Sequence, residues 1–144
     1  MCLKHVTKRI KTVKGQSGIG YKIVKRSRSK LHDYIGLFRS ACAMRTNKWM
    51  SADKSRTLRT DDCSGKTYSC GFHIFTKLED AKEALAYKRR WGSDPSRTYV
   101  LVEVKYTRGR TIGIDTTVGV YAECIVAEGM KVLRQIKHRT RKSR

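Results

Sequence analysis

The sequence is poor in several features that would point to particular classes of protein. It has one proline, Pro95, and no low-complexity tract, so it is neither a proline-rich linker nor a repetitive disordered chain. It contains no run of about 18 apolar residues, the length that a membrane-spanning helix needs. Its first 14 residues carry five Lys or Arg and no apolar stretch typical of a secretion signal. We therefore expect a cytoplasmic protein that is not inserted in a membrane.

Acidic residues are absent from both ends of the chain. The 144 residues carry a formal net charge of +21, from 33 Lys and Arg against 12 Asp and Glu. Residues 1–30 contain ten of the basic residues and residues 131–144 contain seven, without one Asp or Glu in either segment. These two segments thus supply 17 of the 21 excess positive charges. Such a concentration of one sign would strain a compact state unless a polyanion neutralises it.

Nucleic acid is the polyanion that best fits this distribution, because each phosphate that a Lys or Arg neutralises releases condensed counterions. A solvated surface that keeps the protein soluble is the alternative. An anionic membrane fits less well, since neither basic segment has the apolar face of an interfacial helix. RNA, free or in a ribonucleoprotein, is slightly favoured over DNA because no helix-turn-helix or homeodomain pattern is visible. The candidate phosphate-binding residues lie in the basic terminal segments: Lys8, Arg9, Lys11, Lys14, Lys25, Arg26, Arg28, Lys137, Arg139, Arg141 and Lys142.

The five cysteines are odd in number and irregular in spacing, which indicates reduced thiols. Cys63, Cys70 and His73 form a C-x6-C-x2-H pattern that lacks the short C-x2-4-C spacing and the nearby fourth ligand of a zinc site. We expect no metal or other cofactor, with Cys42 and Cys124 packing as small buried side chains.

Helical periodicity is clear in one segment. Thr76-x-x-Glu79 has the pattern of a capping box, and apolar residues then recur at helical spacing. Three basic residues precede Gly92, which is typical of a helix end. The sequence therefore predicts a helix over residues 77–90.

Alternation with period two predicts strands in most of the remainder. Short strands are expected at 21–24 and 71–75, and longer ones at 100–106, 117–127 and 130–136, with turns at Arg108-Gly109 and Glu128-Gly129. Residues 30–43 fit either a strand or a helix, and residues 45–69 resemble a long loop. We expect an α+β fold with a mainly antiparallel sheet. A basic arm (1–20) and a basic tail (137–144) would flank one domain (21–136).

A search for catalytic motifs finds no Walker loop, nucleophile elbow, zinc-protease helix or calcium loop. Tyr68, Phe72 and Phe75 alternate with Lys66 and His73. Aromatic side chains beside cations can stack on bases, although at strand spacing they also serve as core residues.

The order of segments in the second half resembles that of ADP-ribosyltransferase-like domains. Gly71-Phe-His-Ile-Phe75 precedes an Ala-rich helix, Tyr99-Val-Leu-Val-Glu-Val104 follows, and Ala122-Glu-Cys-Ile-Val126 comes last. The resemblance implies a degenerate core of that type, with Glu123 in the place of the catalytic glutamate. That carboxylate would stabilise the oxocarbenium ion that develops as nicotinamide leaves NAD. An NAD-dependent ADP-ribosyltransferase acting on a nucleic-acid-associated target is therefore the second hypothesis, after nucleic-acid binding.

Short motifs also resemble small uncharacterised proteins of phages and viruses, which carry Y-K-V-V, then G-F-H-x-F and E-D-A. The matching segments are Tyr21-Lys-Ile-Val24, Gly71-Phe-His-Ile-Phe75 and Glu79-Asp-Ala81. The resemblance covers about residues 21–136 and implies a phage-encoded protein acting in the host cytoplasm. A viral inhibitor of a host nucleic-acid machine is accordingly the third hypothesis.

Overall fold

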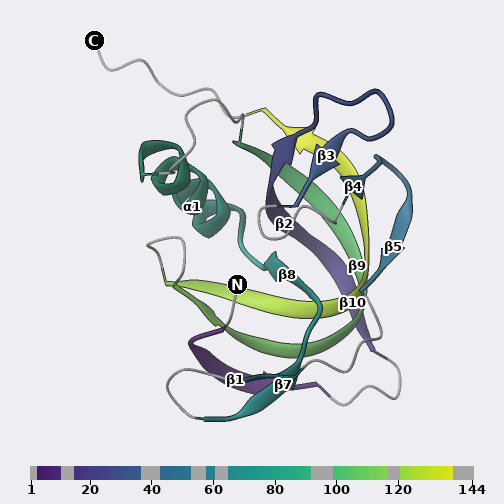
Figure 1. The fold of residues 1–144 in the computed structure, drawn as a ribbon. Helices are drawn as coiled ribbons and strands as arrows, with labels where there is room; N and C mark the ends of the chain where they lie inside the picture. The colour runs from purple at the N-terminus through teal and green to yellow at the C-terminus, as the bar shows by residue number, and fades with distance from the viewer. Residues whose placement is uncertain are drawn as a thin grey trace.

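The computed structural model describes residues 3–10, 15–36, 43–52, 58–60, 65–91, 99–116 and 121–137. Within these ranges the chain forms one helix and ten strands (Figure 1), and the expected α+β class with a mainly antiparallel sheet is confirmed. In chain order the elements are β1 (His5–Arg9), β2 (Gln16–Arg26), β3 (Tyr34–Ile35), β4 (Ala43–Met44), β5 (Trp49–Ser51), β6 (Leu58–Thr60), β7 (Thr67–Ser69), β8 (Phe72–Phe75), α1 (Leu78–Trp91), β9 (Tyr99–Asp115) and β10 (Ala122–Ile136).

Helix α1 lies within one residue of its predicted position. Its first intrahelical bond runs from the Ala81 amide to the Lys77 carbonyl at 3.2 Å. The expected capping box is replaced by other contacts, because the Thr76 hydroxyl donates to Glu123 and the Glu79 carboxylate pairs with Lys82 at 2.7 Å. The acidic first turn and basic last turn still complement the helix dipole. No described helix has the length and apolar composition that crossing a bilayer requires.

Strands β9 and β10 form one long antiparallel hairpin, and both predicted internal turns are wrong. Arg108 has a left-handed φ of 54°, but it lies inside β9. Val126 pairs with Thr111 and Ala127 with Gly109, so β9 carries an extra residue opposite β10. Such a bulge bends a strand without ending it. Glu128-Gly129 likewise lies within β10, where Gly129 pairs with Thr107.

The N-terminal segment differs from the expected basic arm over its described residues. Strand β1 pairs with the last part of β9, and β2 begins at Gln16. Leu3 and Val6 are buried in the core. Leu3 lies before β1 and the pairing register shifts just after Val6, so the segment has no period-two apolar pattern that would indicate a strand. At Gly113 a Cβ atom would collide with the His5 carbonyl oxygen, so the glycine permits the close approach of β1.

The sheet closes on itself. Strand β2 pairs with β9 along residues 16–25 and with β8 at Tyr21, so the path β9–β10–β8–β2 returns to β9. One apolar cluster draws on all four of these strands and includes Val24, Ile74, Val102 and Ile125. The expected shared face of Val100, Val102, Val104 and Tyr106 is confirmed as part of this cluster.

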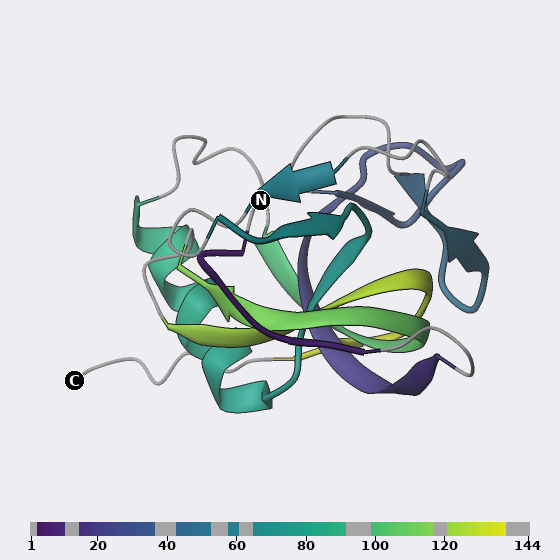
Figure 2. The ribbon, with the colours of Figure 1, turned by 90° about the horizontal axis from the view of Figure 1, so that it is seen from below.

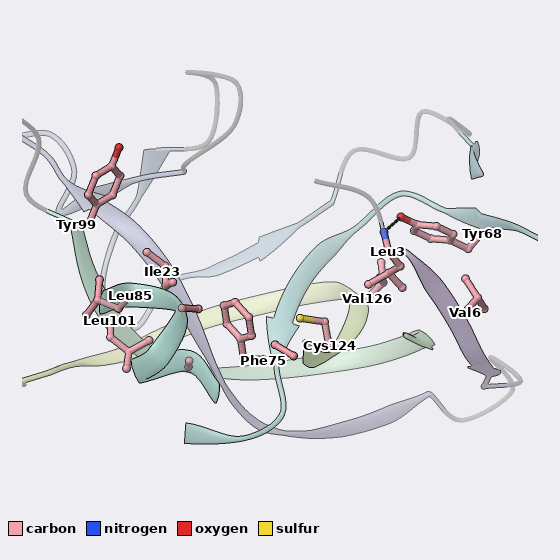
Figure 3. Close-up of a cluster of buried hydrophobic side chains, with 13 residues drawn as sticks. Leu3, Val6, Ile23, Tyr68, Phe75, Leu85, Tyr99, Leu101, Cys124 and Val126 are labelled. Atoms are coloured by element: carbon pink, nitrogen blue, oxygen red, sulfur yellow. Dashed lines mark hydrogen bonds between the residues drawn. The ribbon is translucent and has the colours of Figure 1, made fainter. Parts of the chain in front are cut away.

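A second cluster lies on the other face of the same strands. Helix α1 contributes Ala81, Ala84 and Leu85 to it, and the cluster continues to Leu3 at the start of the chain. Figure 3 shows this extended arrangement, with the Leu3 amide donating to the Tyr68 hydroxyl at 2.6 Å. In Figure 2, α1 lies to one side of the β9–β10 hairpin. Because α1 covers this face from outside, the other cluster fills the closed ring of strands.

The middle of the chain contains more strand than expected. Strand β3 lies within residues 30–43, which the sequence left open between strand and helix, and it pairs with both β2 and β4. The expected long loop over residues 45–69 contains β5, which pairs with β10, and the separate pair β6–β7. These strands have two or three residues each, too few for a periodic signal.

Candidate nucleic-acid interface

Two of the predicted basic segments meet at one end of the sheet. Strand β9 begins there between β2 and β10, with Tyr99 opposite Lys25 and Leu101 opposite Ile136. The Arg26 guanidinium donates to the side-chain oxygen of Gln135 at 2.9 Å. In Figure 1 the ends of β2 and β10 accordingly lie at the top, and β1 lies at the bottom.

The last turn of α1 adds cations to this end. The Arg89 guanidinium donates two hydrogen bonds to the Tyr99 carbonyl, at 2.9 and 3.3 Å. The Lys88 ammonium lies 5.8 Å from the centre of the Tyr99 ring. Since Tyr99 pairs with Lys25, the helix end and the end of β2 are neighbours. We call this region the basic end, and its members are Lys25, Arg26, Arg28, Lys88, Arg89, Arg90, Arg134 and Lys137.

The carboxylates near the basic end are already engaged. Glu103 pairs with Arg134 at 2.6 Å, and this hydrogen bond raises the pKa of the guanidinium. The Arg134 side chain nevertheless remains 72% exposed. Asp33 accepts the Thr46 backbone N–H at 2.8 Å, and this bond lowers the pKa of its carboxyl. Within the described ranges, no acidic side chain forms an ion pair with Arg26, Arg28 or Lys137.

The structure does not bring all the candidate residues together. Lys8 pairs opposite Ile112, which is 13 residues further along β9 than Tyr99. There Lys8 and Lys66 line a hollow of about 340 Å³ beside Val6. Arg9 lies in β1 at the same far end. The other candidates, Lys11, Lys14, Arg139, Arg141 and Lys142, lie outside the described residues.

A further pair of arginines shares one carboxylate within the fold. Arg110 pairs with Glu128 at 2.8 Å, and Arg108 lies 3.5 Å from the same carboxylate. Arg110 also donates to the Cys70 carbonyl at 3.2 Å. These side chains therefore hold the bulged part of β9 against β10 and against the segment between β7 and β8.

Glu123 is held at the start of α1. Its carboxylate accepts the Thr76 hydroxyl at 2.8 Å, and its carbonyl accepts the Thr76 amide at 3.1 Å. Next to it, Cys124 is buried as expected, and burial, followed by the charge of Asp115, raises the pKa of its thiol. The contacts of Glu123 thus fasten the segment before α1 to β10.

The sequence left open whether the aromatic residues near residue 70 stack on bases or serve as core residues, and the structure shows core packing. Tyr68 and Phe75 are buried, and Phe72 packs against the cluster inside the ring. Tyr68 and Phe75 are therefore not available for base stacking. Two exposed aromatic residues of α1, Tyr87 and Trp91, were missed. Their spacing of four, which places both rings on one side of the helix, was the signal available in the sequence.

The cysteine and histidine pattern gives no metal-binding cluster among the described residues. Cys70 is half-buried and His73 is buried, whereas Cys42 and Cys63 lie outside the described ranges.

Comparison with protein-family models, curated proteins and solved structures found no match to this chain.

Proposed function

We propose that the protein binds nucleic acid through the phosphate backbone, with the basic end as its main contact surface. The observation that carries the proposal is the meeting of cations from three separate elements at one end of the sheet. Arg26 and Lys137 come from the ends of β2 and β10, and Arg89 from the last turn of α1. Convergence from distant parts of the sequence gives a continuous charged surface, to which a polyanion can make several contacts at once.

The chemistry of this end suits phosphate. Guanidinium groups can form paired hydrogen bonds with phosphate oxygens, while the lysines supply compact point charges. The nearby carboxylates of Glu103 and Asp33 already accept hydrogen bonds from Arg134 and Thr46. Contacts of this kind position a nucleic acid and carry little sequence information. We therefore expect weak sequence preference.

The character of α1 supports RNA over duplex DNA as the ligand. The helix packs Ala81, Ala84 and Leu85 against the sheet, and its first turn carries Glu79 and Asp80. A recognition helix normally contacts base edges through its N-terminal residues, and acidic residues there would repel the flanking phosphates. The ligand that we propose is RNA, either free or within a ribonucleoprotein.

The test compares two variants of the full chain that lose the same charge. One replaces Arg26, Arg28 and Lys137 by Gln at the basic end, and the other replaces Lys4, Lys8 and Lys66 by Gln at the far end. Binding to labelled RNA is measured by fluorescence anisotropy at increasing KCl concentration. At about 0.1 M salt, counterion release is worth roughly fivefold in affinity per contact. The basic-end variant should therefore bind about 10- to 100-fold more weakly, with a salt slope lower by about 2.

The far-end variant should stay within about threefold of the wild type, because only long-range attraction is reduced. Equal losses in the two variants would reject the basic end as the contact surface. An affinity that does not change when the salt concentration is doubled would reject phosphate contact altogether. Copurification with and without nuclease then separates free RNA from a host nucleic-acid machine.

The transferase that the resemblance implies is tested separately. It would use Glu123, whose carboxylate accepts the Thr76 hydroxyl at 2.8 Å. Incubation of the wild-type protein with labelled NAD is the direct assay, with Glu123→Gln as the control. If the assay detects neither transfer of label nor hydrolysis of NAD, the transferase hypothesis is rejected and the binding proposal is unaffected.

A further inference from the structure

The last two turns of α1 expose two aromatic side chains. Trp91 is 66% exposed and Tyr87 is 42% exposed. Residues four apart lie on the same side of a helix. The buried residues Ala81, Ala84 and Leu85 face the sheet. Ala84 lies three residues before Tyr87, so the two rings border this buried face and remain open to solvent. Tyr87 and Trp91 therefore form an aromatic surface that the core of this chain does not use.

Cations of the basic end border this aromatic surface. The Arg90 guanidinium lies 5.2 Å from the centre of the Trp91 ring. Lys88, one turn before Trp91, reaches over Tyr99 at the start of β9. Glu83 lies on the side of Tyr87 that faces the start of α1, about 12 Å along the axis from Trp91. Positive charge thus surrounds the C-terminal part of the surface, where Trp91 lies.

We propose that the nucleic acid bound at the basic end is single-stranded and that its unpaired bases stack on Trp91 and Tyr87. This inference rests on the proposed function. The faces of unpaired bases stack on aromatic rings, and an arginine beside the ring adds a cation–π contribution. In a duplex the base faces are covered by neighbouring base pairs, so a duplex would reach only the cations. The combination of a phosphate-binding surface with two adjacent exposed rings therefore favours a single strand.

Another exposed aromatic residue provides a matched control. Tyr121 is 79% exposed and precedes β10. It lies beside the pair Ala122–Asp115, at the opposite end of the β9–β10 hairpin from Ile136 and Leu101. Replacement of Tyr121 by Ala removes an exposed ring without changing the basic end.

The experiment measures the affinity of the full chain for an oligouridine of about 12 nucleotides and for an RNA duplex of the same length. Trp91→Ala should weaken binding to the single strand about 5- to 100-fold, because each stacked base contributes at that level. Trp91→Phe should retain most of the affinity, and Tyr121→Ala should change it by less than about twofold. The salt slope should stay the same in all three variants, because none of them removes a charge. Duplex binding should not respond to Trp91→Ala.

Fluorescence gives a second measurement. Trp49 and Trp91 are the two tryptophans of the chain, so the variant Trp49→Phe leaves Trp91 as the sole reporter. Addition of oligouridine should quench its emission. If Trp91→Ala binds the single strand as tightly as the wild type with an unchanged salt slope, stacking is rejected and phosphate binding stands. If neither RNA binds the wild-type protein, the proposed function itself fails. A thermal melt confirms that each variant remains folded.

Discussion

The basic end and the bulged middle of β9 both carry clustered arginines, but the two regions differ in how these arginines are paired with acidic side chains. At the bulge, Arg108 and Arg110 share the carboxylate of Glu128, and Arg110 also binds the Cys70 carbonyl. At the basic end, Arg26 bonds to the neutral side chain of Gln135 and Arg28 is exposed. At the bulge the arginines pair with an acid of the neighbouring strand, although Arg108 stays 56% exposed. At the basic end, no acid among the described residues pairs with Arg26 or Arg28.

The comparison shows why net charge alone does not locate a binding surface. At the bulge, the single carboxylate of Glu128 offsets half the charge of Arg108 and Arg110, so the pair contributes less to the field outside the protein than two unpaired arginines would. Glu103 is the counterpart of Glu128 at the basic end, yet its partner Arg134 remains mostly exposed. The placement of a few acids among many bases therefore determines which part of the surface attracts a polyanion.

The largest effect is expected from loosening α1. Leu85 is buried and packs in the same cluster as Leu101 and Ile23, which holds the helix cations against the start of β9. Leu85→Ala should lower the free energy of unfolding by about 2–5 kcal/mol, from the lost apolar burial and the cavity left behind. Urea denaturation measures this change. At a concentration where the variant is still folded, its RNA affinity should also fall because the cations of the last helical turn are less well positioned.

Val126→Ala is the matched control for that experiment. Val126 belongs to the same cluster but pairs with β8 at His73, away from the basic end. This variant should lose about 1–3 kcal/mol of stability, with no change in RNA affinity of the folded protein. If both variants weaken RNA binding equally, the support of the basic end by α1 is not specific.

Much of the fold followed from periodicity where the chain is regular. The spacing of apolar residues after Thr76 predicted α1, and the alternation from Val100 to Tyr106 predicted the face of β9 that fills the ring. The sequence failed where a strand bends instead of ending. Arg108-Gly109 and Glu128-Gly129 have the composition of turns, but pairing with long neighbouring strands keeps both inside the ladder. Only tertiary pairing distinguishes a bulge from a turn.

Only part of the candidate site could be predicted from the sequence, again because tertiary pairing determines which segments meet. The sequence marked basic segments but assigned residues 1–20 to an arm, because local charge outweighed the two isolated apolar residues Leu3 and Val6. It did not connect the cations of α1 with those of β2 and β10, which meet only through pairing with β9. The sequence also could not show which aromatic side chains are exposed. Tyr68 and Trp91 are both aromatic residues near cations, but Tyr68 is buried and Trp91 is exposed.

The next effect in size comes from removing the acid that offsets part of the charge at the bulge. Glu128→Gln should release Arg108 and Arg110 and create a second positive region. If one or two additional phosphate contacts form, RNA affinity at low salt should rise about fivefold and the salt slope should steepen by about 1. Anisotropy titrations at several KCl concentrations measure both quantities. An unchanged slope would mean that the bulge lies beyond the reach of bound RNA, which would confine the contact to the basic end.

The smallest effect is expected from the corresponding substitution at the basic end itself, Glu103→Gln. The Arg134 side chain is already 72% exposed, so the loss of its partner Glu103 makes little additional guanidinium surface accessible. An exposed ion pair of this kind contributes little to stability because solvent screens it, and the melting temperature should therefore change little. RNA affinity should rise by about twofold, because one guanidinium no longer divides its hydrogen bonds between Glu103 and phosphate. An increase as large as that from Glu128→Gln would mean that Arg134 is suppressed as fully as the bulge arginines. The basic end and the bulge would then differ in the number of their cations and not in how acids are placed among them.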